Sequence, residues 1–148
     1  MVKDDLIGSG VLVTGGGTGI GKACAASLVR NGASVTICGR TEGRLQLAQE
    51  EIAQASGREE KIQYRVCDVT EEEQVEEAMA AASHFGNGLN GVVANAGGGG
   101  ALAPYHLQGL EEFTRVLHLN VLGTMLCIKH SVPYLKESGG GSFVGMSS

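Results

Sequence analysis

Two kinds of hydrophobic pattern alternate along this chain. Short runs rich in β-branched residues are typical of buried strands, and longer segments with an apolar residue at every third or fourth position are typical of helices. The short runs predict strands at residues 11–14, 34–38, 62–67, 91–95 and 142–146. Because strands that alternate with helices form βαβ units around a parallel sheet, the pattern predicts an α/β fold.

The first two intervals between strands predict one helix each. The first helix opens in residues 15–21, before Gly32 ends it. Its predicted apolar face consists of Ile20, Cys24, Ser27 and Leu28. The second helix is predicted to begin after a capping Thr41 and to end at Gly57. Its predicted face consists of Leu45, Ala48, Ile52 and Ala55.

The later intervals carry two further helical patterns. Thr70 and the three glutamates that follow it predict a helix start, because a hydroxyl cap and carboxylates stabilise the positive end of a helix dipole. The predicted inward face of this helix consists of Val75, Ala78, Met79, Ala82 and Phe85. Residues 110–135 continue as one helix or two, and Pro133 is expected to distort only the last turn. One side of this segment consists of Phe113, Leu117, Asn120 and Thr124.

Composition narrows the class of protein. Glycine accounts for 24 of 148 residues, about 16 % against a usual value of about 7 %. Only 2 prolines accompany it and 43 % of the residues are hydrophobic, which excludes a collagen-like fibre and a disordered linker. No repeat or linker divides the chain, so we expect residues 1–148 to form a single domain.

Charge and cysteine usage exclude further classes. The net charge is -5, the pI is near 5.3 and no basic cluster is present, which argues against nucleic acid as a partner. No apolar stretch approaches the roughly 18 residues of a membrane span, so we expect no membrane partner. The 4 cysteines and 4 histidines show no ligand spacing, which predicts no metal site and a reducing, cytoplasmic location.

Residues 14–21 form a glycine-rich loop between a predicted strand and a predicted helix. Glycine permits a tight turn, a close approach of the backbone to a diphosphate, and contact between helix and strand without a side chain between them. The helix N-terminus also directs free N–H groups at an anion. The loop therefore predicts a dinucleotide site, with a purely structural turn as the alternative. The gap of three residues between Gly15 and Gly19 differs from the tighter G-x-G-x-x-G spacing.

Small and polar residues follow the third and fourth predicted strands. Asp68 and Val69 come after one strand, and Asn95, Ala96 and Gly97 come at the end of the other. Because ligands of open α/β sheets bind at the carboxyl ends of the strands, we expect these residues to lie beside the glycine-rich loop. Taken alone, Asp68 and Asn95 are also explained as turn formers.

Together these motifs resemble the short-chain dehydrogenase/reductase superfamily. The resemblance rests on Thr-Gly-x-x-x-Gly-x-Gly at residues 14–21, Asp-Val-Thr at 68–70, Asn-Ala-Gly at 95–97, Leu-Asn-Val at 119–121 and a strand with two terminal serines at 141–148, in the order of the family. It implies a Rossmann-type doubly wound parallel sheet with strand order 3-2-1-4-5. It also implies a dinucleotide-binding domain that is incomplete at its C-terminus.

The resemblance implies a role for each matching position. Asp68 and Val69 would meet the adenine, and Asn95, Ala96 and Gly97 would line the cofactor and brace the fourth strand. The residues that would hold the diphosphate and the adjoining ribose are Thr14, Gly15, Gly17, Thr18, Gly19, Ile20 and Gly21.

The turn after the second strand predicts which nicotinamide cofactor binds. Proteins that prefer NAD usually place an acid about 20 residues past the glycine-rich loop. This chain has Cys-Gly-Arg-Thr at residues 38–41 instead, and Arg40 has the charge and the fork geometry that suit a 2′-phosphate. We therefore expect NADP, with NAD as the less favoured cofactor. The alternative is that Arg40 is a solvated surface residue.

The resemblance also implies part of a catalytic site. Ser148 matches the serine that hydrogen-bonds the substrate oxygen, and Asn120 matches an asparagine that positions a water in the proton relay. From the residues alone, Asn120 is better explained as a buried amide with satisfied hydrogen bonds. The family's Tyr, with a Lys four residues later, has no counterpart here. The residues four positions after Tyr64, Tyr105 and Tyr134 are Asp68, Gly109 and Ser138.

We expect an NADP-dependent oxidoreductase that transfers a hydride between nicotinamide C4 and a small molecule, interconverting an alcohol and a carbonyl or reducing an enoyl-type substrate. Without the Tyr and Lys pair, the 148-residue polypeptide is expected to be inactive alone. The alternative is a non-catalytic dinucleotide-binding module or redox-sensing subunit. A methyltransferase fits less well, because it would need an acid after the second strand. In many relatives the helices matching residues 110–135 form the subunit interface, which implies a homo-oligomer, a dimer or tetramer.

Overall fold

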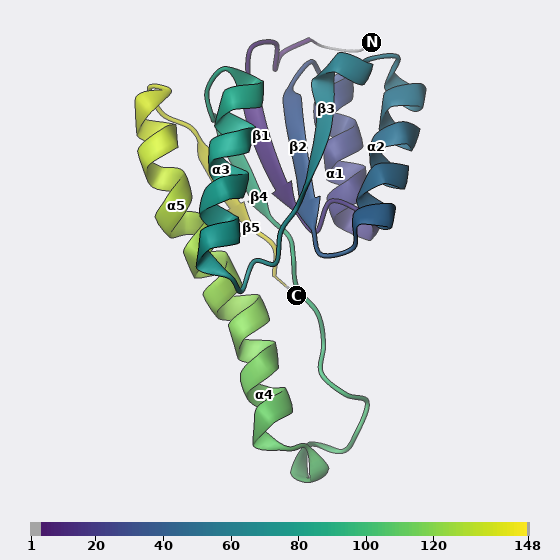
Figure 1. Cartoon of the computed structure of the whole chain (residues 1–148), viewed down its shortest axis with the longest axis vertical. Coiled ribbons are helices and arrows are strands. Elements are labelled where there is room, and N and C mark those ends of the chain that lie inside the picture. Colours follow the sequence, from purple (N-terminus) through teal and green to yellow (C-terminus); the bar gives the residue numbers. More distant parts are fainter. Residues whose placement is uncertain (1–3, 148) are drawn as a thin grey trace.

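Five parallel strands form one sheet in the spatial order β3-β2-β1-β4-β5 (Figure 1). The strands are β1 (Gly10–Thr14), β2 (Ser34–Gly39), β3 (Ile62–Val66), β4 (Gly91–Ala94) and β5 (Ser142–Gly145). The computed structural model describes residues 4–147. Both the α/β class and the strand order 3-2-1-4-5 are confirmed, and each predicted strand boundary agrees with the structure to within one residue.

Helices cover both faces of the sheet (Figure 1). The four helices that pack on it are α1 (Gly19–Arg30), α2 (Glu42–Ser56), α3 (Glu72–Gly86) and α5 (Gly123–Glu137). Val11 and Val13 of β1 belong to the core beneath α1 and α2, whereas Leu12 belongs to the core beneath α3 and α5. Because a central strand of a parallel sheet is buried on both faces, β1 needs a continuous hydrophobic run rather than an alternating one.

The predicted inward faces of α2 and α3 are confirmed except at their last positions. The buried residues of α2 include Leu45, Ala48 and Ile52, but Ala55 is exposed. The buried residues of α3 are Val75, Ala78, Met79, Ala82 and Gly86, whereas Phe85 is only half-buried.

The predicted face of α1 is wrong. The buried residues of this helix are Gly21, Ala25 and Val29, and Ile20 is 62 % exposed. None of the other predicted positions, Cys24, Ser27 and Leu28, is buried. The physical reason is the closeness of α1 to the loop after β1, where a Cβ on Gly21 would lie 2.3 Å from the carbonyl oxygen of Gly15. A contact this close selects small residues, which a search for hydrophobic periodicity passes over.

The predicted cap of α3 is also wrong. The helix begins at Glu72 with Glu71 at the cap position, and Glu72 and Glu73 lie in its first turn. Thr70 instead belongs to a turn in which its backbone N–H and its hydroxyl both donate to Asp68 Oδ1, at 3.0 and 2.7 Å. The carboxylates still stand at the positive end of the helix dipole, as the sequence predicted.

A projecting arm of residues 98–117 extends beyond the edge of the sheet at which the strands end (Figure 1). It consists of the loop after β4, a short 3-10 helix (Tyr105–Leu107) and α4 (Leu110–Leu117). A π-helical turn (His118–Leu122) joins α4 directly to α5, so the predicted segment is two helices in one continuous rod. Helix α5 continues to Glu137, past Pro133.

The rod formed by α4, the π-helical turn and α5 carries an exposed apolar stripe. Its members recur every three or four residues and are between 40 and 79 % exposed. They are Leu110, Phe113, Leu117, Val121, Met125, Ile128 and Val132. A contiguous apolar surface of this kind typically marks an interaction site. Over the described residues, every helix is too short or too polar to traverse a bilayer.

Candidate dinucleotide site

A pocket of about 370 Å³ opens at the carboxyl edge of the sheet, in the place where ligands of open α/β sheets bind. Its walls come from the loops after β1, β2, β3 and β4, from the start of α2 and from the π-helical turn. The lining residues are Gly15, Gly17, Thr18, Gly19, Ile20, Gly39, Arg40, Thr41, Arg44, Leu45, Cys67, Asp68, Val69, Asn95, Ala96, Gly97 and Leu119. The structure therefore brings together all the predicted cofactor residues except Thr14 and Gly21.

The glycines of the loop after β1 have different structural roles. Gly15 has φ +64°, and a Cβ there would lie 2.8 Å from Asn95 Nδ2 and 3.0 Å from Ala96 Cα. Gly19 has φ +54° and faces open space, since a Cβ there would meet nothing within 4 Å. Gly15 is thus required for contact with the neighbouring strand, whereas Gly19 gives the backbone its left-handed turn at the N-terminus of α1.

Gly21 meets the third requirement of a dinucleotide-binding loop, close packing of helix on strand. A Cβ on Gly21 would lie 2.3 Å from the Gly15 carbonyl oxygen and 2.5 Å from Asn95 Nδ2. Gly16, which the sequence analysis did not single out, has a similar part. Its N–H donates to the Cys38 carbonyl at 3.1 Å, and a Cβ on it would lie 2.6 Å from Ile37 Cβ. Gly16 and Gly21 therefore shape the glycine-rich loop through contacts within the protein, and neither of them lines the pocket.

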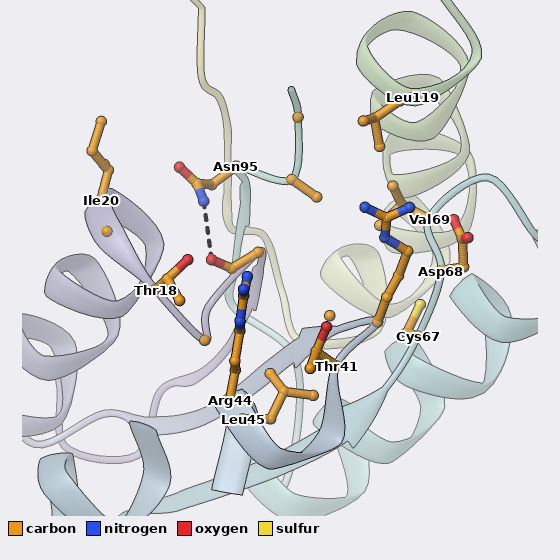
Figure 2. A pocket seen from close by; sticks show the side chains of 17 residues that line it. Thr18, Ile20, Thr41, Arg44, Leu45, Cys67, Asp68, Val69, Asn95 and Leu119 are labelled. Atoms are coloured by element: carbon orange, nitrogen blue, oxygen red, sulfur yellow. Dashed lines mark hydrogen bonds between the residues drawn. The ribbon is translucent and has the colours of Figure 1, made fainter. Parts of the chain in front are cut away.

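Thr14 is buried, at 2 % exposure, and acts as a joint between strands. Its Oγ1 accepts hydrogen bonds from the backbone N–H groups of Asn95 (3.0 Å) and Ala96 (2.9 Å). In return, Asn95 Nδ2 donates to the carbonyl oxygens of Thr14 (3.2 Å) and Gly15 (3.3 Å), and the second of these bonds is drawn in Figure 2. The pair locks the end of β1 to the end of β4 and holds the glycine-rich loop in place.

Asp68 is both a turn former and a pocket residue, the two interpretations that the sequence left open. Its Oδ1 accepts both hydrogen bonds from Thr70, as in a turn, while the residue also lines the pocket. Gln74 Oε1 accepts from the Asp68 N–H at 2.8 Å, which fixes the backbone there. Val69 beside it is 5 % exposed and packs against Gly123. Asp68, Val69 and Leu119 lie on the same side of the pocket, across from Thr18 and Ile20 (Figure 2).

Two arginines line the pocket, and only one of them was predicted. Arg40 follows β2 and is exposed, as both of its interpretations require. Arg44 lies in the first turn of α2, and its side chain points towards Thr18 (Figure 2). No sequence motif singled it out, although a basic residue four positions after Arg40 was a usable signal, because α2 begins at Glu42 and its first turn returns to the pocket.

Cys38, Cys67 and Cys127 belong to the same hydrophobic core, Cys67 also lines the pocket, and all three are free thiols. Burial raises the pKa of Cys127 to about 12. A hydrogen bond with Cys67, followed by burial, raises the pKa of Cys38 well above its usual value, and the same bond lowers the pKa of Cys67. Cys38 and Cys127 are therefore neutral thiols at physiological pH and serve as small apolar core residues.

Asn120 is exposed rather than buried, which corrects the interpretation made from its residue type alone. Its Oδ1 accepts from Gly98 N–H at 3.1 Å, and its Nδ2 donates to the carbonyls of Gly98 (2.8 Å) and Val116 (2.9 Å). The π-helical turn places it where it reaches the loop after β4, outside the lining of the pocket. The second predicted catalytic residue, Ser148, lies outside the described residues.

A second pocket, of about 570 Å³, adjoins the first and shares Arg40, Asp68 and Leu119 with it. Its remaining walls are Thr70 and residues of α4 and the π-helical turn. The arm therefore extends the hollow at the carboxyl edge of the sheet beyond the glycine-rich loop.

Relatives of this chain are dehydrogenases and reductases. It is 37 % identical over 145 residues to 2,5-dichloro-2,5-cyclohexadiene-1,4-diol dehydrogenase of Sphingobium indicum, a match that covers 97 % of this chain and 56 % of the relative. A short-chain type dehydrogenase/reductase from Mycobacterium ulcerans has a similar structure, with 40 % identity, a TM-score of 0.91 and coverage of 97 % of this chain and 52 % of that one. The chain thus spans about half the length of these two relatives.

Two further structures contain nicotinamide cofactors. The C-domain of a bacterial malonyl-CoA reductase, solved with NADP, has 26 % identity, a TM-score of 0.89 and coverage of 97 % of this chain and 23 % of that one. An NAD+-bound xylitol dehydrogenase has 28 % identity, a TM-score of 0.87 and coverage of 94 % and 52 %. A sequence profile described as short chain dehydrogenase matches residues 9–148, and it agrees with the fold and the pocket described above: this chain belongs to the short chain dehydrogenase family.

Proposed function

We propose that this chain is the dinucleotide-binding part of an NADP-dependent oxidoreductase that interconverts an alcohol and a carbonyl, or reduces an enoyl-type substrate. One observation carries the proposal. The pocket joins a glycine-rich loop at the N-terminus of α1 to a turn after β2 that presents arginine and no carboxylate. The dehydrogenase and reductase relatives support the class of reaction.

The residues of the pocket suit each part of a dinucleotide. The backbone of residues 15–19 approaches the pocket without side chains other than that of Thr18, and the N-terminus of α1 adds a positive dipole for a diphosphate. Val69 and Leu119 supply apolar surface for a base on the opposite side. Arg40 is free to bind a phosphate, since it forms no ion pair within residues 4–147.

A bound nicotinamide supplies the hydride, and the protein manages the proton and the orientation of the substrate. We propose that Ser148 donates a hydrogen bond to the reacting substrate oxygen and that Asn120 belongs to the proton relay. Asn120 already connects the loop after β4 to the π-helical turn through Gly98. No tyrosine of the chain is followed four residues later by lysine, so we propose that the 148-residue polypeptide binds dinucleotide without turnover.

The test is a fluorescence titration of the complete protein with NADPH and with NADH, followed by reduction assays on a panel of ketones and enoyl thioesters. We expect tighter binding of NADPH and reduction of at least one class of substrate. In Arg40→Ala the preference for NADPH should fall by about one to two decades, because a charged hydrogen bond contributes about 1.5–3 kcal/mol. Equal affinities for the two cofactors in the unmodified protein would contradict NADP.

A non-catalytic dinucleotide-binding module is the second candidate, and the absence of a Tyr-x-x-x-Lys sequence within the chain favours it. It would bind the cofactor as tightly as an enzyme does. The reduction assays separate the two, because the module would show binding without turnover even in the complete protein.

We further propose that the protein is a homo-oligomer, a dimer or tetramer, in a reducing cytoplasm. The exposed apolar stripe along α4 and α5 supports the first part, since a second copy of the same stripe would bury it. Four free cysteines, at Cys24, Cys38, Cys67 and Cys127, are compatible with the second.

A further inference from the structure

Arg44 is placed in the dinucleotide pocket by α2 rather than by a binding motif. It lines the pocket together with Thr41 and Leu45, and Figure 2 shows its side chain pointing towards Thr18 of the glycine-rich loop. Its Cβ would lie 3.5 Å from a Cβ on Gly17, which is ordinary van der Waals contact. The base of the Arg44 side chain therefore lies beside the glycine-rich loop, and the residue as a whole is exposed.

The charge of Arg44 has no ion-pair partner among residues 4–147. Within residues 4–147, the arginines that form ion pairs are Arg58, with Asp4, and Arg115, with Glu112. The acid in the first turn of α2, Glu42, accepts a hydrogen bond from Tyr64 Oη at 3.2 Å and does not line the pocket.

The pocket as a whole is positive, although the chain has a net charge of -5. Its charged lining residues are Arg40, Arg44 and Asp68. The carboxylate of Asp68 accepts two hydrogen bonds from Thr70, so it is already engaged within its own turn. Two guanidiniums consequently face the pocket without compensation, and both come from the segment that follows β2.

We propose that Arg44 is a second cofactor-selecting residue, which binds the 2′-phosphate of NADP jointly with Arg40. The inference rests on the proposed function, in which this pocket binds a nicotinamide dinucleotide. The ribose that carries the 2′ position binds at the end of the second strand in such folds. Arg40 lines the pocket from the turn after β2, and Arg44 lines it from the first turn of α2. A phosphate monoester carries a charge of about −1.5 to −2 at neutral pH, which suits two cations.

The competing role for Arg44 is binding of the diphosphate, since its side chain points towards Thr18. That role would make no distinction between cofactors, because NAD and NADP share the diphosphate. Only contact with the 2′-phosphate produces a loss confined to NADP.

The experiment measures dissociation constants of the complete protein for NADPH, NADH, adenosine 2′,5′-bisphosphate and 5′-AMP. The two adenosine nucleotides lack nicotinamide, so they report on this end of the pocket independently of turnover. The variants are Arg44→Ala and Arg44→Lys. The control is Arg30→Ala, an exposed arginine in the last turn of α1 that does not line the pocket.

For Arg44→Ala we expect the dissociation constants for NADPH and the 2′,5′-bisphosphate to rise at least about tenfold, the effect of losing one charged hydrogen bond. Those for NADH and 5′-AMP should stay unchanged. Arg44→Lys should recover part of the loss, because it keeps the charge without the fork. Arg30→Ala should have no effect on any ligand.

An equal loss for NADPH and NADH in Arg44→Ala would assign the residue to the diphosphate and overturn the inference, as would no loss for either. A preference for NADPH that falls in Arg40→Ala but keeps its full size in Arg44→Ala overturns the role of Arg44 and leaves the proposed function intact. Unmodified protein that binds NADH as tightly as NADPH overturns both, and it does so before any variant is compared.

Discussion

The glycine-rich loop after β1 and the arm of residues 98–117 are held by contacts of different kinds. The loop is enclosed by backbone atoms and by Thr14 and Asn95, all of them at or beside buried strand ends. The arm is held by exposed side chains, since Asn120 bonds to Gly98 and Glu112 accepts from the N–H of Ala101 at 2.9 Å. The loop is therefore rigid within this chain alone, whereas the arm presents an apolar surface that residues 4–147 leave uncovered.

The two regions are therefore suited to different partners, the loop to a ligand and the arm to another surface. Because the loop already packs against its own strands, binding of a ligand there requires little further ordering of the loop and so a small free-energy cost. An arm that carries part of an exposed apolar stripe is suited to contact with another surface. Substitutions in the loop should therefore change folding and cofactor binding, and substitutions on the arm should change local order and assembly.

The largest effect is expected for Gly21→Ala. The added Cβ would lie 2.3 Å from the carbonyl oxygen of Gly15, so α1 must move away from β1. We expect a loss of about 3 kcal/mol in the free energy of unfolding, the upper end of ordinary overpacking, and loss of NADPH binding. Urea denaturation and fluorescence titration measure the two.

The control for this variant is Gly43→Ala in α2. A Cβ on Gly43 would meet nothing within 4 Å, and alanine should stabilise the helix by about 0.8–1 kcal/mol. If both variants had the same stability, the close contact between α1 and β1 would not exist in solution.

A smaller loss of stability is expected for Thr14→Val. The substitution preserves shape but removes the acceptor of the N–H groups of Asn95 and Ala96. Both N–H groups are only part-buried, so we expect a combined loss of about 1–2 kcal/mol in the free energy of unfolding, in the lower part of the range for unsatisfied groups. Thr14→Ser keeps the hydroxyl and should retain the affinity for NADPH that Thr14→Val loses. Equal affinities in the two variants would show that the hydroxyl does not position the loop.

Next in size is Asn120→Ala, which tests how the arm is held. It removes the side-chain bonds to Gly98, and at this exposed position we expect a stability loss of about 0.5–1.5 kcal/mol. Hydrogen exchange at residues 97–100 should become faster. Asn31→Ala, which removes an exposed asparagine bond to the Ser27 carbonyl in α1, should leave that exchange unchanged. Unaltered exchange in Asn120→Ala would mean that the loop after β4 is held by something else.

The smallest effect on the stability of one chain is expected for Leu117→Asp on the apolar stripe. Leu117 is 45 % exposed, so the free energy of unfolding should change by less than about 0.5 kcal/mol. The homo-oligomer proposed above should dissociate, as measured by light scattering of the complete protein after gel filtration. Thr114→Asp, at an exposed position of α4 outside the stripe, is the control. An unchanged oligomer in Leu117→Asp would exclude the stripe as the subunit interface.

Prediction from sequence succeeded where the chemistry is local. The strands at residues 11–14 and 34–38 were predicted from their apolar runs, and Gly15 and Gly19 from their place between a strand and a helix. It failed where contacts depend on packing. The face of α1 was misassigned because a close approach at Gly21 selects small residues, and the cap of α3 because Asp68 captures Thr70.

The candidate site shows the same contrast between features that are local in sequence and features that depend on packing. The sequence indicated the glycine-rich loop, Arg40, Asp68 and the segment after Asn95 as neighbours, because the carboxyl ends of parallel strands meet at one edge. It could not show that Thr14 works as a joint rather than as a ligand. The bond from the Asn95 N–H to Thr14 Oγ1 spans 81 residues of chain.

The alternation of strands and helices and the glycine-rich loop before α1 can be read from short segments, since periodicity and backbone freedom are local properties. Which polar groups face the pocket and which join its walls follows from the folded arrangement. It turned Arg44 of α2 towards the pocket, and it placed Asn120 at an exposed position of the π-helical turn instead of in the core. Such assignments depend on atoms far apart in sequence being brought within a few ångströms, and no local pattern records that distance.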